Sequence, residues 1–265
     1  MNEWVEKSLR VAESQNYLDR LSEIYPAKPL PRRPLEDDVK NRIRELHGRG
    51  DWKELLKIIL KQSKRGHPFP VEHPYASILR QKPKLMENNP KVTQTLGSML
   101  LKISIDEIFR GIERSIDINR VMGPAFHNWL RRYFPSQGIP VLPQHRFESY
   151  KDKAFLDARN ASILKYLNEK FGYVLDRGRD FLFRTADKLV VGEARFLSTS
   201  GGSQTRDLKE VIEFVRKMKE KIVAVGVVDG IVWFNRSYIK LLSGLADDEP
   251  VLSALLLKDF LGSLG

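Results

Sequence analysis

The chain has 265 residues, of which 42% are hydrophobic and 30% charged, and its formal net charge is +11. This is the composition of a folded globular protein rather than a disordered chain, and the absence of cysteine excludes disulfides, thiolate zinc sites and cysteine nucleophiles. The basic charge favours a polyanionic partner such as nucleic acid, because each phosphate that a basic side chain neutralises releases counterions.

No apolar run in the sequence approaches the roughly 20 residues that a helix needs to span a bilayer. The first residues, MNEWVEKSLRVAESQNYL, mix apolar and charged positions and lack the uninterrupted apolar core of a signal peptide. The sequence therefore predicts a cytoplasmic protein.

The first half of the chain is expected to be mainly helical. Apolar residues recur at helical spacing over residues 2–24, 36–46, 52–64 and 92–114. The proline-rich residues 26–34 predict a stiff extended connector, because proline cannot continue a helix. This connector is either a strap lying on the surface or a basic arm that touches a phosphate backbone.

Residues 66–90 hold several prolines and predict irregular structure. Their histidines, His67 and His73, have no close-spaced partners of the kind that a metal site needs. A further helix is predicted up to Phe134, with aromatic residues on one side and Arg131 and Arg132 on the other. These arginines either form a solvated basic face or bind phosphates and bases.

Three prolines within residues 135–150 mark the predicted boundary between a helical region, residues 1–150, and a mixed α/β region, residues 151–265. The elements predicted in the second region are a helix (154–171), a strand (172–176), the two strands of a hairpin (180–185 and 188–197), a helix (206–221) and a buried strand (221–229). The apolar residues 251–264 predict a final helix.

Two carboxylates and a cation are expected to converge at the hairpin. If Ala186 and Asp187 form its turn, Asp180 lies opposite the part of the second strand that carries Glu193. Side chains alternate between the faces of a strand, so Glu193 and Arg195 point the same way. One or two carboxylates are the usual protein ligands of Mg²⁺. The alternative is a buried hairpin with incidental charges.

An acid, a hairpin and then acid-x-cation on the next strand resembles the PD-(D/E)xK nuclease superfamily. The following segment, GGSQTRDL, is similar to what several type II restriction endonucleases carry, and the resemblance covers roughly residues 150–235. Arg179 stands where the motif has proline, and Arg195 stands where it has lysine. The resemblance implies a restriction-endonuclease-like α-β-β-β-α-β core, a mixed sheet flanked by helices.

The resemblance also implies a reaction, the Mg²⁺-dependent hydrolysis of DNA phosphodiesters. Asp180 and Glu193 would ligate the metal together with the carbonyl of Ala194. Arg195 would hold the phosphate and position the attacking water, because its guanidinium stays charged and cannot readily act as a base. Glu169 or Asp157 would add a further carboxylate near the metal. Residues 1–150 would wrap and recognise DNA.

Two segments are predicted to contact DNA. Gly201 and Gly202 permit a close backbone approach, and they place Ser203, Gln204 and Arg206 at a helix N-terminus, where phosphate binds well. The alternative is an ordinary turn from strand to helix. The second segment follows the last predicted strand and contributes Asn235 and Arg236, whereas Trp233 and Phe234 are expected in the core.

Three functions remain open from the sequence. The first is a type II restriction endonuclease that cuts double-stranded DNA at a specific site, as a homodimer because two strands must be cut, with the apolar helix 251–264 helping to dimerise. The second is a repair or junction-resolving nuclease with the same core. The third is a catalytically silent nucleic-acid-binding protein, which the arginine at position 195 permits.

Overall fold

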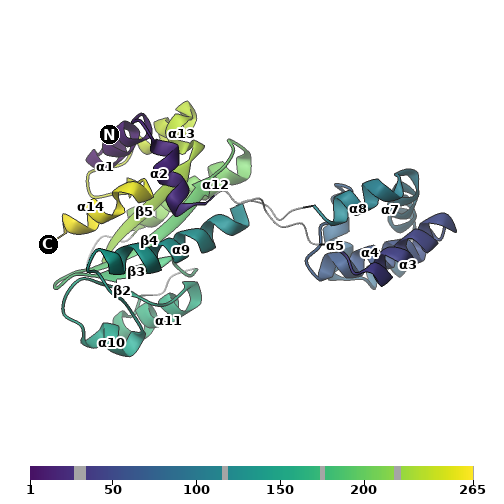
Figure 1. Ribbon diagram of the computed structural model, residues 1–265, viewed down its shortest axis with the longest axis horizontal. Coiled ribbons are helices and arrows are strands. Elements are labelled where there is room, and N and C mark those ends of the chain that lie inside the picture. The colour runs from purple at the N-terminus through teal and green to yellow at the C-terminus, as the bar shows by residue number, and fades with distance from the viewer. Residues whose placement is uncertain (27–33, 115–118, 174–176, 218–221, 265) are drawn as a thin grey trace. The chain divides into compact units, whose positions relative to one another are not determined.

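The computed structural model describes residues 1–26, 34–114, 119–173, 177–217 and 222–264. The chain forms two compact units: the main unit, Met1–Lys28 with Asp117–Gly265, and the helical unit, Pro29–Ile116. Figure 1 shows both units, whose relative placement is not determined. The predicted boundary near residue 150 does not coincide with this division, because the first helices and the helix before residue 136 pack on the sheet.

The helical unit confirms the helical pattern of residues 36–114, with additional breaks. Its helices are α3 (Asp37–Gly48), α4 (Trp52–Lys64), α5 (Ala76–Gln81), α6 (Leu85–Asn88), α7 (Pro90–Lys102) and α8 (Ile105–Ile112). Residues 66–90, predicted to be irregular, thus include two short helices. The single helix predicted over 92–114 is interrupted, because Ser104 and Glu107 form a capping box that starts α8. The unit has its own apolar core, which includes Leu55, Ile59, Leu96 and Ile108.

The main unit is built on a mixed sheet, which in the described residues has six strands in the order β1-β2-β3-β4-β5-β6. The strands are β1 (Val141–Leu142), β2 (Ala154–Leu156), β3 (Phe181–Arg184), β4 (Leu189–Leu197), β5 (Ile222–Gly230) and β6 (Val251–Leu252). Pairing is antiparallel from β2 to β4 and parallel for β1–β2, β4–β5 and β5–β6. The chain is therefore a mixed α/β protein.

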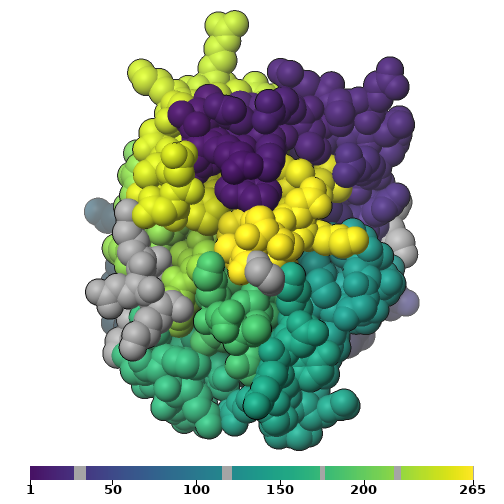
Figure 2. All heavy atoms as spheres, turned by 90° about the vertical axis from the view of Figure 1, so that its left-hand side faces the viewer, coloured from purple at the N-terminus to yellow at the C-terminus, as the bar shows by residue number. Residues whose placement is uncertain are grey.

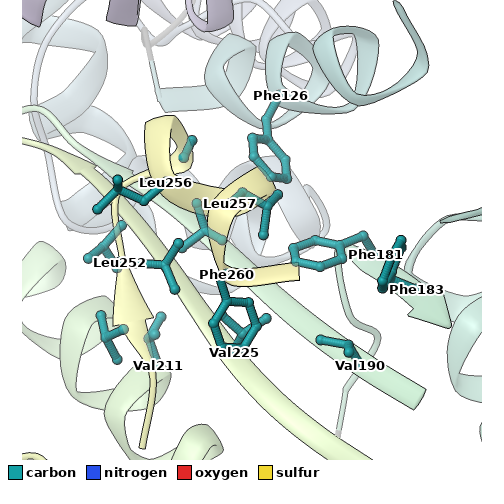
Figure 3. Close-up of a cluster of buried hydrophobic side chains, with 14 of the residues drawn as sticks. Phe126, Phe181, Phe183, Val190, Val211, Val225, Leu252, Leu256, Leu257 and Phe260 are labelled. Carbon is teal, nitrogen blue, oxygen red and sulfur yellow. The ribbon is translucent and has the colours of Figure 1, made fainter. Parts of the chain in front are cut away.

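Helices cover the sheet and close its core. They are α1 (Glu3–Ala12), α2 (Tyr17–Ile24), α9 (Asn119–Ser136), α10 (Gln144–Ser149), α11 (Asn160–Phe171), α12 (Gly202–Lys217), α13 (Arg236–Leu242) and α14 (Leu257–Gly262), with the 3₁₀ turns η1 (Ile231–Phe234) and η2 (Ala254–Leu256). Phe126 of α9, Phe181 of β3 and Phe260 of α14 belong to one buried cluster (Figure 3). None of the described helices is long and apolar enough to cross a membrane.

Several predicted elements differ in the structure. The segment 2–24 is two helices, because Asn16 adopts a left-handed conformation with φ 61°. The helix predicted from residue 154 begins at Asn160, after the strand β2. The strand predicted over 172–176 lies partly outside the described residues, and the described ones are not in a strand. Phe234 is 55% exposed rather than buried, while Trp233 is buried as expected.

The apolar segment 251–264 is not a single surface helix. It contains β6, η2 and α14, and its apolar side chains lie inside the main unit, where Leu252, Leu257 and Leu261 are fully buried. The predicted role of this segment in dimerisation therefore loses its basis, because its apolar face is covered by the same chain. Figure 2 shows the C-terminal segment lying against the N-terminal one on the surface.

A buried carboxylate joins three parts of the main unit. Asp229, at the end of β5, accepts hydrogen bonds from the Tyr25 hydroxyl (3.1 Å), the Ser253 hydroxyl (2.6 Å) and the Ala254 N–H (3.1 Å). Its side chain is fully buried. Burial is the largest influence and raises the pKa of Asp229 to about 7, although the hydrogen bonds oppose it.

This raised pKa predicts how stability depends on pH. A carboxyl whose pKa is higher in the folded state favours folding at low pH, and this contribution is lost as pH rises from about 4 to about 7. Asp229→Asn removes this titration. Between about pH 4 and pH 7, the free energy of unfolding of the variant should therefore fall less than that of the natural protein, by up to about 4 kcal/mol. Urea unfolding at pH 4.5 and at pH 7.5 measures the difference. Asp247→Asn, in an exposed turn, serves as the control and should keep the slope of the natural protein. Equal slopes in all three proteins would contradict the assignment.

Candidate active site

The hairpin of β3 and β4 has the predicted turn and register. Arg184 pairs with Leu189, and the Thr185 N–H donates to the Lys188 carbonyl at 2.9 Å, so residues 186 and 187 form a two-residue loop. The ladder runs back to Phe181 opposite Gly192. One step further, Asp180 therefore lies beside Glu193.

A glycine is required next to Glu193. A Cβ atom built at Gly192 would lie 1.9 Å from the Cζ atom of Phe181, because the phenylalanine ring crosses the opposite strand at this point. The Asp180 N–H donates to the Gly192 carbonyl at 3.0 Å. Gly192 thus lets the ring cover the hairpin while the backbone still fixes Asp180 at its edge.

Asp180 is held by the strand that carries the second acid. Its Oδ2 atom accepts a hydrogen bond from the Ala194 N–H at 2.7 Å and one from Arg195 Nη1 at 3.3 Å. The side chain is 17% exposed. Burial raises the pKa of Asp180, opposed by the Ala194 hydrogen bond and by nearby arginines.

Glu193 is enclosed by three arginines. Its Oε1 atom accepts from Arg177 Nη2 at 2.9 Å and from Arg195 Nη2, and its Oε2 atom accepts from Arg179 Nη1 at 2.9 Å. Only 1% of the side chain is exposed. Burial is the largest influence and raises the pKa of Glu193, while the charge of Arg195 is the largest influence that lowers it. Such a buried acid is retained in charged form only with partners of this kind.

Arg195 connects all three predicted metal ligands. Its guanidinium donates to Asp180 Oδ2, to Glu193 Oε1 and, at 2.9 Å, to the Ala194 carbonyl. Two carboxylates and a carbonyl are the oxygen donors that a hard cation prefers, and here they already surround one positive charge. The donor set thus fits Mg²⁺. The described residues contain no group of three or more His, Cys, Asp or Glu that could hold a metal.

Arg177, Arg179 and His127 were missed by sequence reasoning. Arg179 is buried with its guanidinium 4.3 Å from the centre of the Phe214 ring, and Arg177 joins Glu193 to Glu210 of α12. The charge run RGRD before β3 was the available signal, since it places cations beside the acid that begins the hairpin.

His127 lies on the other side of Asp180. Its Nε2 atom is 4.0 Å from Asp180 Oδ1, and both side chains line a small pocket together with Asp157 and Arg131. Burial lowers the pKa of His127, as do the charges of Arg159 and Arg131. No local pattern in the sequence indicates this contact, because it depends on how α9 packs on the sheet.

The two carboxylates predicted near the metal have different environments. Asp157 follows β2 and pairs with Arg131, so it lies in the pocket that Asp180 lines. Glu169 is exposed on α11, where it pairs with Lys165 at 3.7 Å. The structure brings Asp157 towards the candidate site and leaves Glu169 on the helix surface.

Gln204 holds the loop before α12 together. Its Oε1 atom accepts from the Thr199 N–H at 2.9 Å, and its Nε2 atom donates to the Ser198 hydroxyl at 3.1 Å. The residue is 7% exposed. Ser203 and Arg206, by contrast, are exposed in the first turns of α12. In the first turns of α12, therefore, Gln204 faces the protein, whereas Ser203 and Arg206 face solvent.

The remaining predicted DNA contacts lie on α9 and α13. Asn235 caps α13 and accepts from the N–H groups of Ser237 (3.0 Å) and Tyr238 (3.2 Å), and Arg236 is exposed. The Tyr238 hydroxyl lies 3.4 Å from the Thr199 carbonyl, which links α13 to the loop before α12. On α9, Arg131 pairs with Asp157 and Arg132 is exposed, its Nε atom 3.4 Å from the Asn128 carbonyl.

Comparison with known proteins finds a match to one protein family. The family model described as Tsp45I type II restriction enzyme matches residues 2–264, which is nearly the whole chain. No curated protein and no solved structure matches the chain.

Proposed function

Because the chain belongs to the Tsp45I type II restriction enzyme family and is therefore a site-specific DNA endonuclease, we propose that it makes Mg²⁺-dependent double-strand cuts at the hairpin site. The observation that carries this proposal is the convergence of Asp180 Oδ2, Glu193 Oε1 and the Ala194 carbonyl on one positive charge. Family membership favours this function over the repair nuclease and the silent binder that the sequence left open.

In this proposal Asp180, Glu193 and the Ala194 carbonyl hold Mg²⁺. When bound, the metal offsets the charge that develops at the scissile phosphate and lowers the pKa of an attacking water. Asp180 is kept in register by the Ala194 N–H, and Glu193 is kept in place by Arg177 and Arg179. Support for the PD-(D/E)xK assignment comes from these positions on the hairpin.

Arg195 is proposed to bind the phosphate. A guanidinium presents two parallel N–H groups to phosphate oxygens and stays charged at working pH, so it positions the phosphate and the water without taking a proton. Its side chain is 29% exposed, which gives it access to a substrate. Arg195 would thus position the phosphate and the water and stabilise the developing negative charge. The proton of the attacking water would pass to solvent.

The proposed DNA contacts are exposed and mostly basic. Arg206, Arg236 and Arg132 are exposed on α12, α13 and α9, and Ser203 lies beside Arg206. Arg131 and Asn235 already serve within the protein as an ion-pair partner and a helix cap, and they would contact DNA in addition. We also propose that the N-terminal residues 1–150 wrap the DNA. Because two strands must be cut, we propose that the protein acts as a homodimer.

A plasmid digest tests the proposed function. The purified protein, incubated with plasmid DNA and Mg²⁺, should give discrete linear fragments, and excess EDTA should prevent cutting. A smear or cutting limited to branched substrates would favour the repair nuclease. Discrete cutting in EDTA would overturn the metal requirement while leaving the family assignment intact.

The start of α12 and the loop before it give a separate prediction about DNA binding. Arg206→Ala should weaken binding to all sequences and reduce the salt dependence of log K by about one, because one phosphate contact is lost. Gln204→Ala should leave this salt dependence unchanged, because its amide bonds lie within the loop. Binding of a short duplex at several salt concentrations measures both, with Lys217→Ala at the far end of α12 as the control. If neither variant alters binding or cleavage, the loop is only a turn.

A further inference from the structure

The three arginines around Glu193 differ in their burial and in their contacts. The Arg179 side chain is 6% exposed, bonded to Glu193 Oε2 and packed against Phe214. Arg177 divides its guanidinium between Glu193 and Glu210. Arg195 is 29% exposed, and the hydrogen bonds of its guanidinium go to the three groups assigned above as metal ligands.

A metal ion cannot occupy the space between these oxygens while the Arg195 guanidinium lies there. Mg²⁺ binds oxygen at about 2.0–2.1 Å, with near-octahedral geometry. Arg195 Nη1 lies 2.9 Å from the Ala194 carbonyl and 3.3 Å from Asp180 Oδ2, in the space between the ligands. Two positive charges at such a separation also repel each other strongly in a partly buried site.

We propose that the Arg195 guanidinium is an internal cation that occupies the metal site of the metal-free protein, and that metal binding displaces it. Arg177 and Arg179 keep Glu193 in position in both states, since both bond its carboxylate and are themselves fixed to α12, Arg177 through Glu210 and Arg179 through Phe214. Once displaced, the partly exposed Arg195 side chain is available to a phosphate. This inference rests on the proposed function, because it takes the same three groups as metal ligands.

If metal binding displaces the Arg195 guanidinium, an exchange of one cation for another, removing that guanidinium should raise the metal affinity of the DNA-free protein. Binding of Mn²⁺, measured by isothermal titration calorimetry without DNA, should be at least about tenfold tighter in Arg195→Gln than in the natural protein, which is about 1.4 kcal/mol. Asp180→Asn should lose most of the binding. Arg177→Gln is the matched control, because it removes the same charge from Glu193 without emptying the space between the ligands.

The outcomes separate the exchange from the metal site itself. Tighter binding in Arg195→Gln but not in Arg177→Gln supports exchange. Equal strengthening in both variants overturns it, because the effect is then one of general charge, and so does unchanged or weaker binding in Arg195→Gln. Unchanged binding in Asp180→Asn overturns the metal site and the exchange together. Loss in Asp180→Asn without gain in Arg195→Gln overturns the exchange alone.

The natural protein provides a measurement that does not depend on a variant folding. Phenylglyoxal modifies accessible guanidinium groups, and peptide mass spectrometry reports the extent at each arginine. Saturating Mn²⁺ should increase the modification of Arg195 at least about threefold and leave that of buried Arg179 unchanged. Equal or lower modification of Arg195 in the presence of metal would show that the guanidinium is not displaced.

Discussion

Asp180→Asn should lower the rate of single-turnover DNA cleavage at least about 1,000-fold, an increase of about 4 kcal/mol in the activation barrier. The substitution removes a charged oxygen ligand but keeps an oxygen that can accept the Ala194 N–H, so the hairpin should remain folded. Binding to the same duplex should change by less than about threefold, because DNA affinity comes mainly from phosphate contacts elsewhere.

The control for this substitution is Asp187→Asn, an exposed aspartate in the turn of the same hairpin. It should cut at the natural rate. Glu193→Gln should abolish cleavage as well, but it also leaves three arginines around a neutral group and so should lower thermal stability. Near-natural cleavage by Asp180→Asn would rule out the assignment of Asp180 as a metal ligand.

Arg195→Ala should cut at least about 100-fold more slowly, which is about 2.7 kcal/mol, because it removes a positioned cation from a site where negative charge builds in the transition state. Arg195→Lys should keep partial activity, since lysine supplies the charge but not the paired N–H groups. Single-turnover kinetics of the three proteins on one cognate duplex measures both effects, with Arg146→Ala, at an exposed position of α10, as the control.

The pH dependence adds a second criterion for Arg195. Arginine does not titrate in the working range, so the pH–rate profile of the natural protein should have no limb that disappears in Arg195→Ala. If Arg195 were only a structural ion-pair partner, Arg195→Ala would cut as fast as the natural protein, and its thermal stability alone would change. Fast cleavage by this variant would therefore remove the catalytic role.

The hairpin could be predicted from the sequence because its pattern is local. The two-residue turn at Ala186 and Asp187 fixes the register, and the register places Asp180 beside Glu193. The same kind of local reasoning correctly located α4 and β5 to within a residue of their observed bounds.

The arginines that enclose Glu193 could not be predicted in this way. Arg179 reaches the acid because α12 brings Phe214 under its guanidinium, and this contact joins residues 35 positions apart in the sequence. The burial of the apolar segment 251–264 within its own chain could not be predicted for a related reason. Its hydrophobicity indicates burial, but only the packing of the sheet tells whether the covering surface belongs to the same chain or to a partner.

The link between the two ends of the main unit constrains how the protein can be made. The Asn2 side chain donates to the Glu249 carbonyl at 2.8 Å, and the Ser253 N–H donates to the Ser8 hydroxyl at 3.0 Å. During translation, helix α1 is made well before the residues around 250, on which it docks, have emerged. The helical unit, with its own core, can fold well before that point. Until these residues have emerged, a ribosome-bound chain cannot complete the main unit, so the nuclease assembles only after that point.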